Sequence, residues 1–329
     1  MPFESSSETW GAKQIVVPSR ADAESEVKGG DWAGLFEAVQ NQLNIGGSRQ
    51  RSGTIVLTDS YPLNRTFKVD SHVELVGAYR AKHHLGSSCG FQAQEGFQGN
   101  WVLEWKKPNS RAYYSNFGAG LRKVHVQSVP GIGGVYFRGA QQSAGIENLV
   151  IRGFGEQTIG LRAGGDTYAI RDVFVDAAKG GEKSHARYGA VALELGERRV
   201  LSMRLENITA HNCAEGLRWG DVAQVTLENF ETEVTDVPLV CTYNPRGINI
   251  RNCAFRHTQD VLRLDRVRWW FDCLIKLQGQ VSDNKPGRIT LPGGAVKKIP
   301  KSFDVVIEAD RDGVYVTDQR ELRSLVRKI

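Results

Sequence analysis

A short phrase of apolar, charged and Asn residues recurs through the middle of this 329-residue chain. "LENITA" begins at Leu205 and "LENFET" begins at Leu227, with related phrases on both sides. The starts are Leu121, Ile146, Ile170, Leu205, Leu227 and Ile248. The Asn position recurs every 22 to 25 residues, except for one interval of 35 that contains a polar insertion over 179–189. A repeat of this length indicates a solenoid, in which each unit packs on its neighbours.

A second phrase alternates with the first and has the period-2 pattern of β-strands. It reads "GVYFRG" (134–139), "GLRAGG" (160–165), "ALELG" (192–196), "GLRWGD" (216–221), "PLVCTY" (238–243) and "DVLRLD" (260–265). A leucine-rich repeat would show LxxLxL spacing with a helical half, and a propeller repeat would span about 40 residues. The sequence therefore predicts an all-β, single-stranded parallel β-helix with coils about 4.8 Å apart.

The recurring Asn has a structural explanation. Asn tolerates a left-handed backbone at a corner, and its amide can bond to the equivalent residue of the next coil. We interpret Asn148, Asp172, Asn207, Asn229 and Asn252 as a structural ladder at one corner of the solenoid, with a metal or catalytic role as the alternative.

The two ends of the repeat region need caps, because terminal coils expose apolar edges. Residues 31–46 predict an N-terminal capping helix, with Asp31 as N-cap. Its apolar face comprises Trp32, Leu35, Phe36, Val39 and Leu43. We expect an extended arm over 1–30, the capped β-helix over 31–284, and a small C-terminal β region over 285–329. In the last region, 286–300 is expected to be irregular, and 303–318 to form a hairpin that turns at Asp310 to Gly313.

The helix followed by "GTIVL" and "YPLNRTFKVDSHVELVGAY" (61–79) resembles the entry to right-handed β-helices of the pectate-lyase superfamily, a form that phage tailspikes and related virion proteins share. The similarity covers roughly residues 30 to 265, although "TDSY" (58–61) departs from the usual Pro- or Gly-containing turn. The resemblance implies a right-handed solenoid and, frequently, a trimer. It leaves the activity open, since the fold hosts lyases, hydrolases and inert structural proteins.

The composition and charge of the chain argue against several classes of protein. The net charge is +5, with Lys and Arg dispersed, which disfavours a nucleic-acid-binding protein. The N-terminus has no apolar core of a signal peptide, and no apolar run is long enough for a membrane helix, so we expect synthesis in the cytoplasm, association with a virion if the protein is viral, and no membrane partner. The five Cys contain no CxxC and predict buried thiols rather than a zinc site.

The outward positions of the second phrase predict one vertical row on the solenoid. Its members are Tyr136, Arg162, Glu194, Arg218, Cys241 and Arg263. One interpretation is a lyase site made of Arg162, Glu194, Arg218 and Asp221, because Arg binds carboxylates and, in the pectate lyases, is the usual base beside calcium ligands. The other is a cross-strand ladder of alternating charge. Tyr136, Arg162, Arg218 and Arg263 are the candidates for glycan binding.

Other sites have less support. Polygalacturonase-like members carry an Asp–Asp pair, an NTD triplet, a Ser/Gly-His-Gly and an RIK, and this sequence contains none of them. A carboxylate pair for hydrolysis would need Glu194 with Glu215 or Asp221 from separate coils. His83, His84 and Cys89 lack further metal ligands, and "RVRWW" (266–270) more simply covers the end of the stack than binds single-stranded nucleic acid.

Three hypotheses follow from these patterns. The first is a non-enzymatic structural or adhesive protein of a phage-like virion, a decoration or tail component that is oligomeric and contacts other virion proteins through its arm or tail. The second is a lyase or tailspike-like depolymerase of acidic polysaccharides. We expect no cofactor, with calcium as the alternative only for a lyase. The third is a carbohydrate-binding protein without catalysis.

Overall fold

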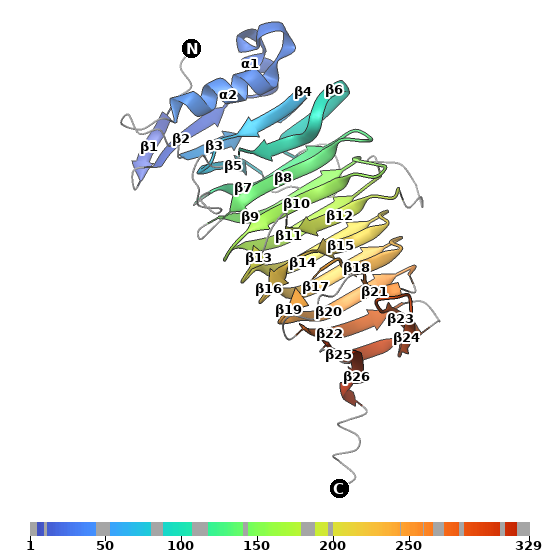
Figure 1. Ribbon diagram of the computed structural model, residues 1–329. Coiled ribbons are helices and arrows are strands. Elements are labelled where there is room, and N and C mark those ends of the chain that lie inside the picture. The colour runs from blue at the N-terminus through green and yellow to red at the C-terminus, as the bar shows by residue number, and fades with distance from the viewer. Residues whose placement is uncertain are drawn as a thin grey trace.

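The chain winds into a right-handed parallel β-helix whose coils are stacked from the N-terminal to the C-terminal end (Figure 1). This computed structural model describes residues 5–9, 12–43, 53–79, 88–106, 118–140, 144–178, 188–196, 200–243, 245–258, 260–265, 273–282, 286–309 and 313–320. Within them, strand pairs with strand in the next coil, so the backbone hydrogen bonds run along the solenoid axis. The predicted fold class is confirmed.

One stack of parallel strands follows the Asn phrase of the repeat. It comprises β2 (Ala12–Val17), β3 (Gly53–Leu57), β5 (Val73–Gly77), β7 (Gly120–Gln127), β9 (Gly145–Arg152), β11 (Ala169–Asp176), β14 (Arg204–His211), β17 (Thr226–Glu233), β20 (Ile248–Arg256) and β22 (Cys273–Val281). From β7 to β20 each strand bends at a left-handed corner residue. We call the part before the corner the first face and the part after it the second face.

The other stack follows the second phrase, and we call it the third face. It comprises the later parts of β4 (Ser60–Val69) and β6 (Gly90–Trp105), followed by β8 (Gly133–Ala140), β10 (Ile159–Gly165), β12 (Val191–Leu195), β15 (Glu215–Trp219), β18 (Val237–Cys241), β21 (Asp260–Leu264) and β23 (Gly287–Thr290). The first parts of β4 and β6 continue the second face instead, since Gly90–Gln92 pair with His125–Gln127 of β7. A small sheet of β13 (Val200–Leu201), β16 (Val222–Ala223) and β19 (Pro245–Arg246) lines one connection. Inward side chains of the three faces form the core.

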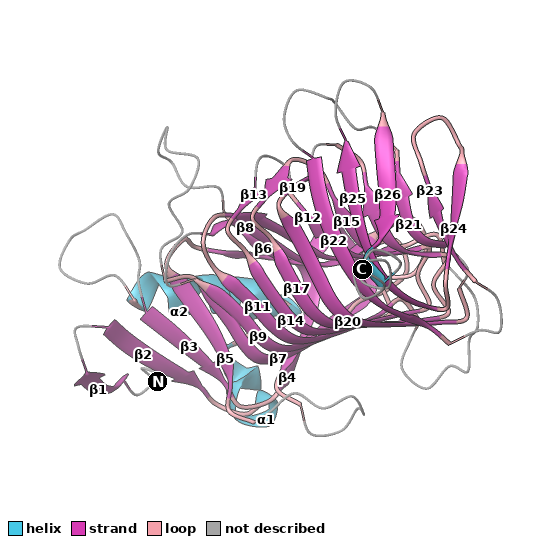
Figure 2. Cartoon of the chain, turned by 90° about the horizontal axis from the view of Figure 1, so that it is seen from below, coloured by secondary structure: helices cyan, strands magenta, loops and turns pink. Residues whose placement is uncertain are grey.

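The predicted N-terminal cap is confirmed as α2 (Trp32–Gln42), which lies at the first coils of the stack (Figure 2). The Asp31 side chain accepts a hydrogen bond from the Gly34 amide at 3.0 Å, as an N-cap does. The predicted apolar face is buried, and Phe36 packs at a centroid distance of 5.1 Å from Tyr61 and of 5.1 Å from Phe91. The helix thereby covers the open end of the core.

The expectation of a separate arm over 1–30 is wrong for much of that segment. β1 (Ser5–Thr9) pairs antiparallel with β2, and β2 pairs in parallel with β3 as part of the stack. Ile15 and Val17 are buried in the core, so the alternation in "KQIVV" is a strand pattern that the sequence analysis missed. Short helical turns follow: α1 (Arg20–Ala23), η1 (Glu24–Glu26) and η2 (Lys28–Gly30).

At the C-terminal end the pairing changes from parallel to antiparallel. β25 (Ser302–Ala309) pairs antiparallel with β22, and β26 (Val314–Asp318) pairs with β25, which confirms the predicted hairpin, although residues 310–312 of its turn lie outside the described residues. The expectation of irregular structure over 286–300 is wrong, because β23 and β24 (Val296–Ile299) form a second hairpin. The division at 284/285 stays a prediction, and β23 still pairs in parallel with β21.

The structure also bears on the cysteines and on membrane-spanning helices. Cys89, Cys213, Cys241 and Cys253 are buried and form no disulfide, as predicted for structural thiols. None of the helices that the structure describes has the length and apolar character needed to cross a bilayer.

Candidate functional site: the outward row of the third face

The predicted row runs up the third face through consecutive strands. Tyr136, Arg162, Glu194 and Arg218 are register partners from β8 to β15. In β18, however, the row continues through Val240, which pairs with Arg218 on one side and Arg263 on the other. The expectation of an outward Cys241 is therefore wrong.

The error at Cys241 is a shift of one residue. Cys241 is fully buried and lies in register with the inward Trp219, with its Sγ 3.1 Å from the Tyr243 carbonyl oxygen. "PLVCTY" begins with Pro and "DVLRLD" with Asp, whereas the other four phrases begin with the Gly or Ala that fixed their phase. The phase of "PLVCTY" was therefore not fixed by its first residue, and a shift of one residue moves every side chain to the opposite face.

Three arginines and two glutamates of this face form a continuous set of ion pairs, which we call the third-face ladder. Arg162 Nε lies 2.8 Å from Glu194 Oε1, and Arg218 Nη1 lies 3.4 Å from Glu194 Oε2. Arg218 Nε lies 2.6 Å from Glu215 Oε2, and Arg263 Nη2 lies 2.7 Å from Glu215 Oε1. Every member thus contacts an opposite charge.

The glutamates of the ladder are its least exposed members. The side chains of Glu194 and Glu215 are 13% and 10% exposed, whereas those of Arg162, Arg218 and Arg263 are 26%, 34% and 33% exposed. The guanidinium groups therefore shield the carboxylates from water. A nearly buried carboxylate is stable only when it is paired, so the arginines are structurally required.

The pKa shifts in the ladder favour permanent charge. Burial on its own would raise the pKa of Glu215, but the hydrogen bonds and charges of Arg218 and Arg263 outweigh burial and lower it. Burial likewise would lower the pKa of Arg218, but Glu215 and Glu194 raise it above its ordinary value. These shifts keep Arg218 protonated and Glu215 ionised. A catalytic base must instead lose its proton, and a catalytic acid must hold one.

The four residues of the expected lyase site are not all brought together. Arg162, Glu194 and Arg218 are in contact, but Asp221 follows the end of β15 and pairs with Arg246 of β19 at 3.2 Å. Asp221 is therefore part of the connection beside the small sheet. Among the described residues, no group of three or more His, Cys, Asp and Glu side chains is arranged to hold a metal ion such as calcium.

Towards the N-terminal end the row changes from ion pairs to aromatic contacts. Trp101 and Tyr136 pack with ring centroids 5.2 Å apart, and the Arg162 and Arg138 guanidinium groups lie over the Tyr136 ring at 5.6 and 4.1 Å. Arg138 also pairs with Glu104 at 3.0 Å. Tyr136 is only 2% exposed, so its ring supports arginines rather than presenting a face on which a sugar ring could stack.

The Asn positions lie at the corner between the first and second faces. Asn148, Asp172, Asn207, Asn229 and Asn252 have φ between 52° and 57°, the left-handed region that Asn and Asp tolerate best. Asn207 donates to Asp172 at 2.8 Å, and Asn229 donates to Asn207 at 2.9 Å. These bonds join Asp172, Asn207 and Asn229 across three coils, and a ladder through all five positions stays a prediction.

The second face carries an outward cluster that the sequence analysis did not identify. Val150 and Phe174 are 3% and 7% exposed and form an apolar pair separate from the core. Arg152 lies over the Phe174 ring at 5.0 Å, and His211 packs against the same ring at 5.0 Å. Burial, helped by the charge of Arg152, lowers the pKa of nearby His125 to about 4. The outward alternation of "VHV" and "VFV" could have indicated this cluster.

Several candidates lie partly or wholly outside the described residues. These are His83 and His84, "RVRWW" (266–270) and most of the polar insertion over 179–189.

Comparison with known proteins gives matches in structure alone. No family model matches the sequence, and no curated protein sequence matches it. The tailspike gp42 of Acinetobacter phage vb_AbaP_AS12 is 12% identical with a TM-score of 0.47, and the match covers 70% of this chain and 40% of the tailspike. This chain therefore spans less than half of that protein.

Two further structures are similar over more of the chain. ORF18 of Geobacillus virus E2 is 10% identical with a TM-score of 0.35, and the match covers 93% of this chain and 76% of ORF18. PfbA, a surface adhesin of Streptococcus pneumoniae, is 8% identical with a TM-score of 0.29, and the match covers 85% of this chain and 94% of the adhesin.

Proposed function

We propose that this chain is a non-enzymatic structural or adhesive β-helix protein of a phage-like virion. The observation that carries the proposal is the third-face ladder. The side chains best placed to act on a polysaccharide form ion pairs with one another, since Arg218 pairs with both Glu194 and Glu215. The virion setting rests on the resemblance of the N-terminal helix and first coil to the entry of tailspike-like β-helices.

The ladder is a poor catalytic site for either reaction considered. A lyase needs a base near the substrate, and the raised pKa of Arg218 opposes loss of its proton. A glycoside hydrolase needs one protonated carboxylic acid, and the lowered pKa of Glu215 opposes that state. The same residues suit a rigid outer surface, because each pair links one coil to the next.

A depolymerisation screen tests the proposal. The full chain is incubated with acidic polysaccharides, and unsaturated uronate absorbance and chain length are followed over time. We expect no cleavage. Cleavage that Arg218→Ala abolishes without loss of folding would overturn the proposal and establish the alternative, a polysaccharide lyase or tailspike-like depolymerase that uses Arg162, Glu194 and Arg218.

Assembly supplies a second test. We propose a homo-oligomer, with a trimer favoured by the resemblance, that contacts other virion proteins through residues 1–30 or 300–329. Sedimentation equilibrium of the full chain should give about three times the monomer mass of 36.4 kDa. A monomer at all concentrations would argue against a virion component of this kind.

A further inference from the structure

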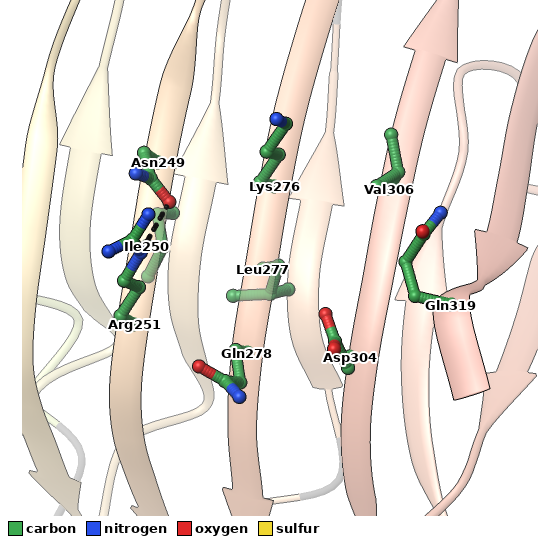
Figure 3. A pocket seen from close by; sticks show the side chains of 9 residues that line it. All are labelled: Asn249, Ile250, Arg251, Lys276, Leu277, Gln278, Asp304, Val306 and Gln319. Atoms are coloured by element: carbon green, nitrogen blue, oxygen red, sulfur yellow. Dashed lines mark hydrogen bonds between the residues drawn. The ribbon is translucent and has the colours of Figure 1, made fainter. Parts of the chain in front are cut away.

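Two adjoining hollows open where the parallel stack changes to antiparallel pairing. The first has a volume of about 310 Å³, and β20, β22 and β25 contribute most of its lining (Figure 3). The second, of about 490 Å³, lies beside it and shares Gln278 and Asp304. Both hollows are on the outside of the solenoid, away from the third-face ladder.

The hollows have a local structural cause. β20 turns at the left-handed corner residue Asn252, but β22 has no left-handed residue at the equivalent place. The register accordingly shifts between Ile250, which pairs with Leu277, and Cys253, which pairs with Gly279. Two residues of β20 thus face one residue of β22, as in a bulge, and the outward side chains spread apart there.

The first hollow holds two cations of a different kind from those of the ladder. Arg251 Nε donates a hydrogen bond to the side-chain oxygen of Asn249 at 3.2 Å. Neither Arg251 nor Lys276 has a carboxylate partner among the residues that the structure describes. The register neighbour of Arg251, Glu228, lies 3.9 Å from Arg204 instead. Asp304 also lines the hollow, so its charged side chains sum to +1 (two cations, one anion).

The rest of the lining indicates the chemistry of a ligand. Asn249, Gln278 and Gln319 provide amide groups that both donate and accept hydrogen bonds, as sugar hydroxyls require (Figure 3). The described lining contains no aromatic side chain, so a flat apolar ligand gains little there. The two cations favour an anionic group, and Arg binds a carboxylate or sulfate through paired hydrogen bonds.

We propose that this hollow is a binding subsite for an anionic saccharide unit, with Arg251 and Lys276 contacting the anionic group and Asn249, Gln278 and Gln319 contacting hydroxyls. This assignment rests on the proposed adhesive role, since it supplies the surface through which adhesion occurs. It places that surface at the C-terminal end of the first face instead of on the third-face ladder.

The test measures binding of three probes to the full chain by titration calorimetry: an oligogalacturonate, a sulfated galactan oligosaccharide and a neutral galactan oligosaccharide. We expect both anionic probes to bind and the neutral one not to bind. Arg251→Gln combined with Lys276→Gln should weaken binding by on the order of tenfold or more, because two charged hydrogen-bond donors are removed. Binding of the sulfated probe alone, or of the carboxylated probe alone, identifies which anion the subsite takes.

The matched control is Lys297→Gln combined with Lys298→Gln, which removes two exposed cations from β24, outside the lining of both hollows. It should bind like the unchanged chain. Equal binding by the double variant and the unchanged chain, tight binding of the neutral probe, or no binding of any probe would overturn the subsite. Cleavage of each probe is monitored in the same samples. If a probe is cleaved and its binding depends on Arg251 and Lys276, the non-enzymatic role is refuted and the subsite is supported. If no probe is cleaved and none binds, only the subsite is refuted.

Discussion

The third-face ladder and the first hollow both present cations on the outside of one solenoid, yet they differ in what balances the charge. In the ladder, Arg218 contacts Glu194 and Glu215 within 3.4 Å. In the hollow, Arg251 contacts the amide of Asn249, and the described structure gives it no carboxylate partner. An arginine in an outward row is therefore not by itself evidence of a site, whereas an arginine without an anion is a place where a ligand could supply one.

The largest effect is expected at the corner between the first and second faces, where each coil from β7 to β20 bends. Asn207→Val forces a β-branched residue into φ near 55° and removes the amide bonds to Asp172 and from Asn229. We expect a loss of about 3 kcal/mol in the free energy of unfolding, measured by urea denaturation. Asn207→Gly keeps the conformation and should lose about 1 kcal/mol, from the amide bonds alone. Equal losses would show that backbone conformation is not the cause.

The next effect separates the two regions directly. Arg218→Ala leaves Glu215 nearly buried with only Arg263 to balance it, and should lower the free energy of unfolding by about 2 kcal/mol. Arg251→Ala removes an exposed arginine without an ion pair in the described structure and should cost less than about 0.5 kcal/mol. Similar losses in urea denaturation would remove the distinction between the ladder and the hollow.

Much of this distinction was accessible from the sequence. Alternation and the Asn phrase predicted the solenoid, the corner positions and the row through Arg162, Glu194 and Arg218. The sequence could not predict that Glu215 bridges two arginines, because that depends on side-chain packing between β15 and β21 rather than on register. The hollow left a signal that was not used: "CLIKLQGQV" (273–281) has no Asn where the earlier coils have one.

Acidification should weaken the ladder. The folded-state pKa of Glu215 is lowered, so the contribution of this carboxylate to the free energy of unfolding is complete above its ordinary pKa of 4.5 and is lost as pH falls below that value.

His125 titrates separately. Burial lowers its pKa from 6.5 to about 4, so the unfolded chain gains its proton first and the free energy of unfolding falls from pH 6.5 to about 4. In a His125→Gln background, the loss between pH 6.5 and 4.5 should shrink and the loss below 4.5 should remain. Unfolding is followed by circular dichroism at each pH, and an unchanged profile in that background would exclude His125 as the cause.

The smallest effect on stability is expected from a substitution that gives the cations of the hollow a carboxylate partner, as the arginines of the ladder have. Gln278→Glu places a carboxylate on β22 between the strands of Arg251 and Asp304, on the same strand as Lys276. Pairing with the cations should stabilise the fold by at most about 0.5 kcal/mol, since the groups are exposed and Asp304 opposes the new charge. The same change should abolish binding of the anionic oligosaccharides, because the site now supplies its own anion. Gln280→Glu, two residues along the strand and outside the first hollow, adds an equal charge and should leave binding within about twofold. If both variants bind as the unchanged chain does, the cations of the hollow do not hold the ligand, and charge balance would no longer distinguish the two regions.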